Sequence, residues 1–244
     1  MCIRDSITAD NEFRASVDVI IPTIGRAGYV KQVVEDLSEQ SLLPKRLIIV
    51  EQQPDHNLGS ELEDLLTQEW PFKIIHIFTN ETGACMARNR ALERVESEWI
   101  FFADDDIRVG NKVLADTIKE ARRLRIDCIN LNCKQVGEET IFNKIKQWGS
   151  FGSGTSVVHS RFARDLRFSE VFEYGYGEDA DFGMKLRQEG CDIVYHPDLL
   201  ILHLKAPSGG LRQTFLQPWQ GDKPKPSPTL MVYAKRYYTR KQLK

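Results

Sequence analysis

Short apolar segments recur along the first 110 residues of the chain, separated by longer stretches that mix apolar and polar positions. Four of these segments have the character of buried strands. They are 17–22 (VDVIIP), 46–50 (RLIIV), 73–78 (KIIHIF) and 99–103 (WIFFA). Pro22 ends the first of them, because proline has no N–H group to donate to a neighbouring strand.

In the stretches between these strands, apolar residues recur at the three- and four-residue spacing of a helix. Three helices are predicted, marked by Val30, Val33, Val34 and Leu37, by Leu62, Leu65 and Leu66, and by Ala84, Ala87, Ala91 and Val95. Strands that alternate with helices predict a parallel, doubly wound sheet with right-handed crossovers. Because such sheets bind ligands at the carboxyl ends of their strands, residues at the strand ends become candidate site residues.

The alternation changes beyond residue 110. A helix is predicted near 113–124 and a short one after Asp181, and strands are predicted over 128–133, 155–158, 192–195 and 199–202. We interpret these elements as α+β structure laid onto the first half, because the sequence shows no internal repeat. The predicted fold class is therefore α/β, a single domain with a mixed, mostly parallel sheet flanked by helices.

Charge is unevenly distributed along the chain. The 244 residues carry a net charge of −2, so nothing in the overall composition points to nucleic acid. A hydrophobic content of 41% is enough for a real core. Residues 205–244, however, hold nine Lys or Arg and one acidic residue, Asp222. This basic, proline-containing tail either contacts an anionic partner such as a membrane surface or is only solvated.

Cysteine usage and the lengths of apolar runs bear on the compartment. The five cysteines are odd in number and include no C-x-x-C pair, which disfavours a zinc site or a disulfide framework. No apolar run approaches the roughly 18 residues of a membrane span. Residues 1–15 lack the apolar centre of a signal peptide and are interpreted as a loose leader. We expect a cytoplasmic protein, peripheral at the inner face of the membrane if the tail binds it.

Three consecutive aspartates, Asp104, Asp105 and Asp106, directly follow the fourth predicted strand. Like charges this close repel one another and contribute nothing to a core, so their place at a strand end indicates a bound divalent cation. Mg²⁺ and Mn²⁺ prefer oxygen ligands and often bridge to substrate phosphates. In an extended turn, Asp104 and Asp106 share one side, as a D-x-D pair requires. The alternative is a solvated acidic turn.

Two further groups of residues belong to the same predicted edge. Pro22 and Thr23 end the first strand and Glu51 ends the second, where a carboxylate can accept hydrogen bonds from a base or a ribose. The alternative for Glu51 is a turn residue. The third helix opens with GACMARN, in which Gly83 lets the backbone approach a ligand and Arg88 can bind a phosphate or position an aspartate. Small residues there also pack the helix against the sheet.

The segment YGYGEDADF, residues 174–182, places aromatic residues and glycines before a group of acids. This pattern suits a mobile loop over a sugar, and one of the acids can act as a general base. Acids at a helix N-terminus also stabilise the helix, which is the alternative for Glu178 or Asp181. His203 follows another apolar run and is either a satisfied core residue or a third metal ligand.

In their order and spacing, these motifs resemble those of family 2-type inverting glycosyltransferases of the GT-A fold. The resemblance spans about residues 17–205 and rests on VDVIIPT, GACMARN, the three aspartates, GEDADF and the late His203. It implies a GT-A domain that lies between the leader (1–15) and the tail (206–244). That domain covers 16–205, with a nucleotide-binding half at 16–110 and an acceptor-binding half at 111–205.

The resemblance also implies roles for individual residues. Asp179 resembles the catalytic base, with Glu178 beside it, and Asp106 and His203 resemble ligands of Mn²⁺ or Mg²⁺. The residues implied on the donor side are Pro22, Thr23, Glu51, Gly83, Arg88, Asn89, Asp104 and Asp105. Family members more often have two aspartates where this chain has Glu51 and Gln52. Candidates for an acceptor platform are Trp148, Tyr174 and Tyr176.

The implied activity is metal-dependent transfer of a sugar, with inversion, from a nucleotide-sugar donor, most commonly a UDP-sugar. The implied acceptor is a carbohydrate or a lipid-linked molecule, as in polysaccharide biosynthesis. A sugar nucleotidyltransferase is one alternative, because residues 23–28 (TIGRAG) partly match the Gly-rich loop of that class. A nucleotide-sugar-binding or scaffold module is another, although the presence of both Asp106 and Asp179 argues against it.

Overall fold

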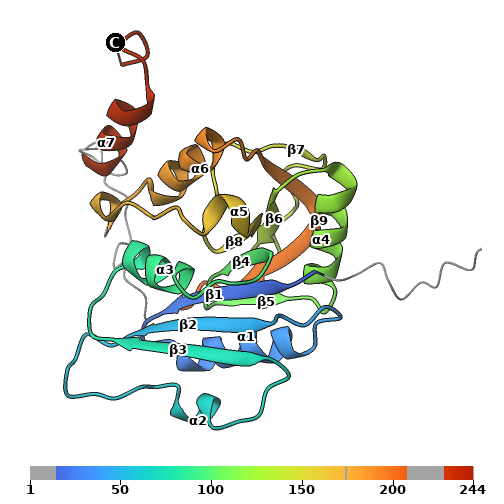
Figure 1. Ribbon diagram of the computed structural model, residues 1–244, viewed down its shortest axis with the longest axis vertical. Coiled ribbons are helices and arrows are strands. Elements are labelled where there is room, and N and C mark those ends of the chain that lie inside the picture. Colours follow the sequence, from blue (N-terminus) through green and yellow to red (C-terminus); the bar gives the residue numbers. More distant parts are fainter. Residues whose placement is uncertain (1–14, 174, 208–227, 244) are drawn as a thin grey trace, which may run out of the picture.

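The computed structural model of the protein describes residues 15–173, 175–207 and 228–243 (Figure 1). Its first four strands are those that the apolar segments predict. They are β1 Val17–Thr23, β2 Arg46–Gln52, β3 Lys73–Thr79 and β4 Trp99–Ala103. Every residue of β2 and β4 is buried, as expected of strands that are covered on both faces.

The three helices of the first half also lie where the apolar spacing predicts them. They are α1 Ala27–Ser38, α2 Glu63–Leu66 and α3 Ala84–Leu92. The buried residues of α1 are the four that mark it in the sequence. The helix α2 is a single turn, much shorter than the other two. The first half is therefore the alternating strand–helix unit that the sequence indicates.

The second half contains shorter and more varied elements. They are β5 Ile107–Val109, α4 Val113–Leu124, β6 Cys128–Lys134, β7 Lys146–Gln147, β8 Thr155–His159, α5 Ser160–Ala163, the 3-10 helix η2 Glu170–Phe172, α6 Glu178–Gln188, β9 Ile193–His203 and α7 Pro228–Tyr237. The sequence predicts α4, β6 and β8. It does not predict β5, β7, α5 or η2, which are at most four residues long.

Two expectations for this half need correction. The strands predicted over 192–195 and 199–202 are one strand, β9, with a register shift against β6. Residues 197–199 lie between the two paired runs, and Pro197 there has no N–H group to donate to β6. The helix expected after Asp181 begins at Glu178, so the acids fill its first turn.

The tail contains a helix that the sequence does not predict. The helix α7 begins at Pro228, and proline fits the first helical turn because the N–H groups there have no intrahelical partner. Three other prolines of the tail, Pro218, Pro224 and Pro226, resist regular structure but lie outside the described residues, as does the leader up to residue 14. The tail is therefore not simply a solvated segment, because residues of α7 pack against the domain.

The sheet has the strand order β3-β2-β1-β4-β8-β6-β9-β5, and β7 pairs with β9 beside this path. The strands β3, β2, β1 and β4 are parallel, and β8 is antiparallel to both β4 and β6. The strand β9 is parallel to β6 and antiparallel to β5. The sheet is therefore mixed, with its parallel part mainly in the first half. The carboxyl ends of β1, β2 and β4 lie at one edge, where a ligand site is expected.

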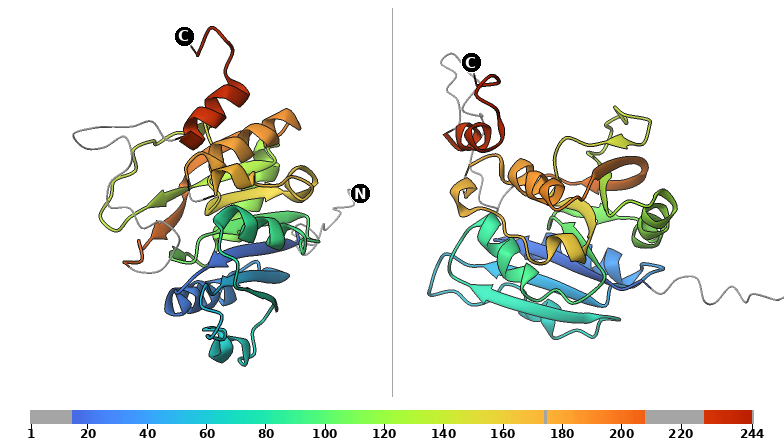
Figure 2. Two further views of the ribbon diagram at one scale, coloured as in Figure 1. Left: turned by 90° about the vertical axis from the view of Figure 1, so that its left-hand side faces the viewer. Right: turned by 45° about the horizontal axis from the view of Figure 1, so that its top comes forward.

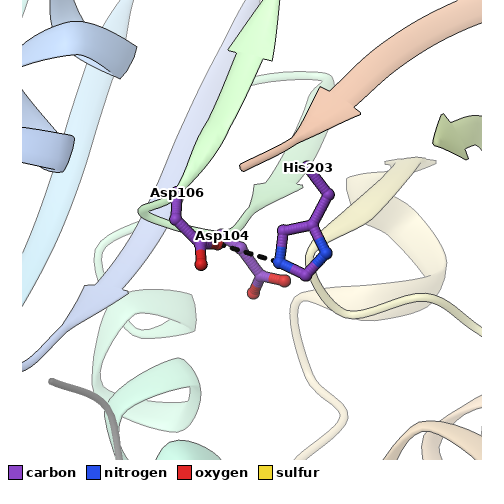
Figure 3. A group of neighbouring side chains, drawn as sticks. All are labelled: Asp104, Asp106 and His203. Carbon is purple, nitrogen blue, oxygen red and sulfur yellow. Dashed lines mark ion pairs between the residues drawn. The ribbon is translucent and has the colours of Figure 1, made fainter. Parts of the chain in front are cut away.

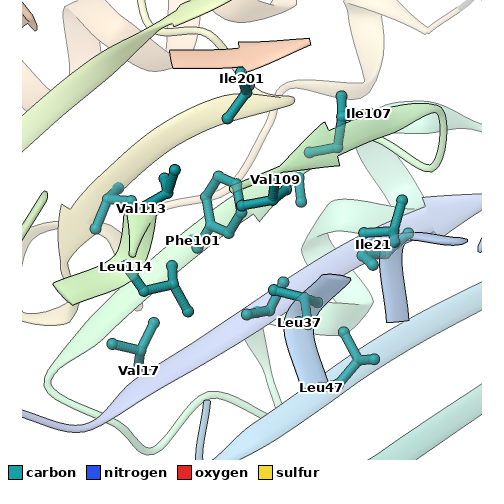
Figure 4. Packing of buried hydrophobic residues seen from close by; sticks show 14 of the residues in the cluster. Val17, Ile21, Leu37, Leu47, Phe101, Ile107, Val109, Val113, Leu114 and Ile201 are labelled. Carbon is teal, nitrogen blue, oxygen red and sulfur yellow. The ribbon is translucent and has the colours of Figure 1, made fainter. Parts of the chain in front are cut away.

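The hydrophobic core forms two clusters, one on each face of the sheet. The helices α1, α2 and α4 contribute to the first cluster, part of which is drawn in Figure 4 around Phe101 and Leu114. The helices α3, α5 and α6 contribute to the second, which includes Phe102 and Phe182. Phe101 and Phe102 are neighbours in β4, and successive strand residues point to opposite faces. This two-sided cover is visible in the turned views of Figure 2.

A buried ion pair joins the amino ends of the first strands. Asp18 of β1 accepts hydrogen bonds from Nε and Nη2 of Arg46 in β2, at 3.0 and 2.7 Å. Ser97 also donates to this carboxylate, through its hydroxyl and its backbone N–H. Burial alone would raise the pKa of Asp18, but these donors hold that pKa below its usual value. The pair lies at the opposite end of β1 from Thr23 and so belongs to the scaffold.

Candidate active site

A cavity of about 600 Å³ lies at the carboxyl edge of the sheet, a volume typical of small-molecule sites. Its walls come from the ends of β1, β2 and β4, the start of α3, the turn at 152–155, the segment that leads into α6, and the residues that follow β9. The predicted site residues that line it are Pro22, Thr23, Arg88, Asp104, Asp105, Asp106, Glu178, Asp179 and His203. The structure thus brings together residues separated by up to 181 positions in the sequence.

Two of the three aspartates and His203 form one cluster in this cavity (Figure 3). One ligand atom from each of Asp104, Asp106 and His203 lies within 4.8 Å of the others. The pairing of β5 with β9 produces this proximity, because it sets Ile107 opposite His203. Nε2 of His203 lies 3.1 Å from Oδ1 of Asp106, which raises the pKa of the histidine. Two carboxylates and an imidazole suit Mn²⁺ or Mg²⁺, so the residues present fit the predicted metal site.

Asp106 is held from several sides. Burial alone would raise its pKa, but His203, the backbone N–H of Ala206 and Arg26 lower it. Ala206 donates to Oδ2 at 2.9 Å, and Nη1 of Arg26 lies 3.3 Å from the same oxygen. The carboxylate is therefore fixed in orientation and kept ionised, as a metal ligand has to be.

Asp105 plays a different part from its two neighbours. It is buried, and it accepts hydrogen bonds from Oγ1 of Thr23 at 2.7 Å and from Nη1 of Arg26 at 2.8 Å. Burial raises the pKa of Asp105 to about 6, although Arg26 and Thr23 act in the opposite direction. Asp105 thus ties the end of β4 to the end of β1. Arg26, which joins Asp105 and Asp106, is a site residue that the sequence analysis assigned only to an alternative function.

Arg88 of α3, the arginine of GACMARN, lies beside Asp104 of the candidate metal site. Its Nη2 is 3.3 Å from Oδ1 of Asp104, and its Nε donates to the carbonyl of Ser153 at 3.3 Å. Asn89 does not face the cavity. Its amide group exchanges hydrogen bonds with the backbone of Phe168, so it fixes α3 to the segment before α6. The expectation that Asn89 binds the donor does not fit this geometry.

Gly83 does not line the cavity, but its lack of a side chain leaves room for the carboxylate of Glu173. A Cβ atom at Gly83 would lie 2.7 Å from the carboxyl carbon of Glu173. That carboxylate accepts hydrogen bonds from the N–H groups of Cys85 and Met86, at 3.0 Å each, at the first turn of α3. Glu173 lines the cavity, and sequence reasoning missed it. In the sequence, Glu173 is only one more acidic residue before the glycine-rich loop, and nothing in its pattern indicates a role in the site.

Asp179 lies in the first turn of α6 and lines the same cavity. Its Oδ1 is buried and has no hydrogen-bond partner among the described residues. Burial raises the pKa of Asp179 to about 6. Repulsion from Glu178 and Asp104 adds to this, while Arg88 and Ser153 act in the opposite direction. A shielded carboxylate with a raised pKa and a free lone pair is suited to accept a proton.

Glu51 lies at the end of β2 but is turned away from the cavity. Its carboxylate accepts hydrogen bonds from the hydroxyl of Ser60 and the N–H of Glu61, and lies 2.8 Å from Nε2 of His76. Burial alone would raise the pKa of Glu51, but these partners lower it. The next residue, Gln52, lines the cavity instead. The structure thus supports the turn role for Glu51 over direct donor contact.

Two of the aromatic candidates for an acceptor platform, Trp148 and Tyr176, do not line the cavity. Trp148 stacks on Tyr195, with ring centroids 4.9 Å apart, and also contacts Phe142. Tyr176 donates its backbone N–H to Thr229 of α7 and is absent from the cavity wall. Tyr174 lies outside the described residues. Trp148 and Tyr176 therefore do not line this cavity, and their assignment to the acceptor stays a prediction.

A sequence model of glycosyl transferase family 2 matches residues 18–177, which is more than half of the chain. The chain belongs to glycosyl transferase family 2. The predicted family is thereby confirmed. A comparison with curated proteins found no match for this family 2 chain.

Solved structures share the fold of this family 2 chain at low sequence identity. Residues 1–349 of S. aureus TarS in complex with UDP-GlcNAc match with a TM-score of 0.65 and 19% identity, covering 83% of this chain and 62% of that TarS fragment. The mannosyltransferase PcManGT from Pyrobaculum calidifontis, in complex with GDP-Man and Mn²⁺, matches with a TM-score of 0.60 and 15% identity, covering 80% and 59%. GalNAc-T7 with UDP, GalNAc and Mn²⁺ matches with a TM-score of 0.64 and 12% identity, covering 80% of this chain and 44% of GalNAc-T7.

These matches confirm the predicted GT-A fold of the family 2 chain. The chain spans 62% or less of the length of each of the three proteins. None of its described helices is long and apolar enough to cross a membrane.

Proposed function

We propose that this family 2 chain transfers a sugar from a nucleotide-sugar donor, in the first instance a UDP-sugar, to a hydroxyl group of an acceptor with inversion. The observation that carries the proposal is the pairing of two features in one cavity. One is the cluster of Asp104, Asp106 and His203, and the other is the shielded, unpartnered oxygen of Asp179. The structures of TarS with UDP-GlcNAc and of PcManGT with GDP-Man and Mn²⁺ support a nucleotide-sugar donor.

Asp104, Asp106 and His203 would hold Mn²⁺ or Mg²⁺ in this proposal. A bound cation would neutralise the charge that develops on the diphosphate leaving group. Three cationic side chains of the cavity, Arg26, Arg88 and Lys205, add positive charge to the same region. They are suited to bind phosphate oxygens, since guanidinium and ammonium groups are strong donors to anions.

Asp179 would act as the general base. It takes the proton from the acceptor hydroxyl while that oxygen attacks the anomeric carbon from the face opposite the diphosphate. The new bond joins the acceptor oxygen to the anomeric carbon, and the bond from that carbon to the diphosphate breaks. A single displacement inverts the anomeric configuration without a covalent enzyme intermediate. Glu178 lies beside the base, where its charge raises the pKa of Asp179.

The remaining assignments extend the proposal. Pro22, Thr23 and Gln52 lie at the strand ends of the cavity, where the nucleoside part of the donor would bind. The acceptor would be a carbohydrate or a lipid-linked molecule. A lipid-linked acceptor would place the protein at the inner face of the membrane, and the basic residues of the C-terminal segment would favour anionic lipids. No nucleic acid is implied by the net charge of −2.

Donor binding and turnover test the proposal separately. Calorimetry with UDP, GDP, CDP and dTDP, each with and without Mn²⁺, should show one diphosphate that binds only with the metal. A product assay with the matching nucleotide sugars should then detect transfer, and NMR of the anomeric proton should show inversion. Binding of a nucleoside triphosphate with formation of a nucleotide sugar would instead identify a nucleotidyltransferase.

A separate variant tests the assignment of Asp179 as the general base. Asp179→Asn removes the proton acceptor while it leaves the size of the side chain almost unchanged, so turnover should fall by about 10²–10⁴-fold. Metal-dependent nucleotide binding should persist. Asp165→Asn is the matched control, because Asp165 is exposed and does not line the cavity. If Asp179→Asn turned over as fast as this control, Asp179 would not be the base.

A further inference from the structure

The helix α7 lies over α6 and over the glycine-rich loop that leads into it, as Figures 1 and 2 show. Val232 and Tyr233 of α7 pack against the second core cluster. The guanidinium of Arg236 lies 5.3 Å from the ring centre of Phe172, which lines the active-site cavity. The C-terminal segment therefore touches the region that carries the proposed base, although more than 40 residues separate the two in the sequence.

Asp181 is the main attachment point of α7. Its side chain is completely buried, so its charge requires partners inside the protein. Two partners are local: the hydroxyl of Ser169 at 2.7 Å and Nζ of Lys185 at 3.0 Å. The other two come from α7: Nη1 of Arg236 at 2.8 Å and the hydroxyl of Tyr237 at 2.9 Å. One cation and one hydroxyl of α7 thus supply half of the donors to a buried carboxylate two residues from Asp179.

A second attachment reaches the loop before α6. Oγ1 of Thr229 accepts the backbone N–H of Tyr176 at 3.0 Å. A Cβ atom at Gly175 would lie 2.5 Å from Cγ2 of Thr229, so the loop backbone and the first turn of α7 are in direct contact. Gly177, which precedes α6, has a φ of 108°, a conformation that favours glycine. Glycines at 175 and 177 make the loop intrinsically flexible, and α7 restrains it.

We propose that α7 is a positioning element of the active site, which holds the loop and first turn that carry Asp179 in their working place. Arg236 and Tyr237 act through Asp181, and Thr229 acts through the backbone of Tyr176. The role in turnover rests on the proposed function, whereas the restraint of the loop does not. Glu173 fixes the other end of the same loop to α3. The base is thus carried by a segment that is held from both sides.

The restraint has a chemical purpose. A general base has to lie within hydrogen-bond reach of the hydroxyl that it deprotonates, and displacements of about 1 Å are costly. No described residue of α7 lines the cavity that contains the strand ends and the cluster of Asp104, Asp106 and His203. Loss of the attachment should therefore lower kcat while donor affinity stays the same.

The test compares the double variant Arg236→Gln/Tyr237→Phe with Lys235→Gln in the 244-residue chain. Lys235 lies on the same helix, is exposed, and has no hydrogen bond or ion pair recorded among the described residues, so its loss removes one charge of α7 without the attachment. Amide hydrogen exchange of residues 175–182 should speed up by at least about tenfold in the double variant, because two donors to a charged partner are lost. It should stay at the wild-type rate in Lys235→Gln.

Turnover provides the second readout. In the double variant, kcat should fall by about tenfold at a temperature where the protein remains folded, with the Kd for the nucleotide diphosphate and metal unchanged. Arg236→Lys alone, which keeps a donor and a charge, should recover most of the exchange protection and of kcat. These results together would support a positioning role.

Three other results have defined meanings. Exchange at 175–182 equal to that of Lys235→Gln would overturn the restraint itself. Faster exchange with a normal kcat would overturn the positioning role and leave α7 a stabilising element only. If the wild-type protein transferred no sugar from any donor, the proposed function would fail, but the exchange data would still decide whether α7 holds the loop.

Discussion

Gly154 and the carboxylate of Asp104 lie so close together that no side chain fits between them. A Cβ atom on Gly154 would lie 2.0 Å from Oδ2 of Asp104 and 2.1 Å from its carboxyl carbon. The backbone N–H of Asp104 also donates to the carbonyl of Gly154 at 3.2 Å. The turn at 152–155 therefore packs directly against one of the proposed metal ligands, although it supplies no ligand itself.

Gly154→Ala should displace the carboxylate of Asp104, because real Cβ atoms do not come within 2.0 Å of an oxygen. We expect the affinity for a nucleotide diphosphate with Mn²⁺ to fall by about 10–100-fold, as for other supports of metal ligands. Calorimetry with UDP and Mn²⁺ measures this. Gly149→Ala is the control, because a Cβ there meets nothing within 4 Å. Equal affinities of the two variants would show that Asp104 can move without loss.

Asp106→Ala should abolish metal-dependent nucleotide binding. Asp106 is the carboxylate in contact with His203, Arg26 and the backbone of Ala206 at once, so its loss leaves the cluster with one carboxylate and one histidine. The measurement is UDP affinity with and without Mn²⁺, with Asp165→Asn as a surface control. An affinity that still rose with Mn²⁺ to the wild-type level would remove Asp106 from the metal site.

The rate should depend on pH through Asp179. Its pKa is raised to about 6 by burial, and only the deprotonated form can accept a proton. The value of kcat/KM should therefore be constant above this pKa and fall about tenfold per pH unit below it. UDP affinity measured over the same range separates this effect from protonation of the metal cluster. A rate that stayed constant down to pH 4, with binding intact, would contradict the base assignment.

The pair of Asp18 and Arg46 should matter for stability alone. Asp18→Asn leaves the buried guanidinium of Arg46 with only the exposed Glu96 as a charge partner, which should lower the unfolding free energy by about 3 kcal/mol, the lower end for a broken buried pair. Arg108→Gln, in a pair whose arginine is largely exposed, should cost about 1 kcal/mol or less. Chemical denaturation measures both.

The same pair predicts how stability responds to acid. The pKa of Asp18 is lower in the folded protein than its ordinary value, so the unfolded chain takes up the proton first as pH falls. The stabilisation should be complete above about pH 4, the unfolded pKa, and should be lost as pH falls through the folded value. The unfolding free energy of the Asp18→Asn variant should depend less on pH in this range than that of the wild-type protein.

The sequence predicts the sheet and its ligand edge well because both depend on local patterns. The apolar runs that form β1, β2 and β4 end where the pattern ends, and the residues after them reach the cavity. Local patterns do not decide which of two neighbouring residues faces that cavity. Glu51 and Gln52 point to opposite sides of β2, and only the packing of surrounding loops decides that Gln52 lines the site.

Contacts between distant parts of the chain lie beyond such patterns. Arg26 binds Asp105 across 79 positions and Arg236 binds Asp181 across 55. The segment TIGRAG, which contains Arg26, suggests only a different function, and Arg236 lies in no motif. Trp148 and Tyr176 show the reverse case. Their aromatic side chains suggest a platform for a sugar. A ring that can stack on a sugar can equally stack on another ring, as Trp148 does on Tyr195.

The attachment of α7 also bears on how far the protein can be shortened. A version cut at residue 177, where the family match ends, would lack both Asp179 and His203. A version cut at residue 205 would keep them, but it would uncover the part of the second core cluster on which Val232 and Tyr233 pack, and would remove two of the four donors to Asp181. The shortest version that retains these contacts ends after Tyr237.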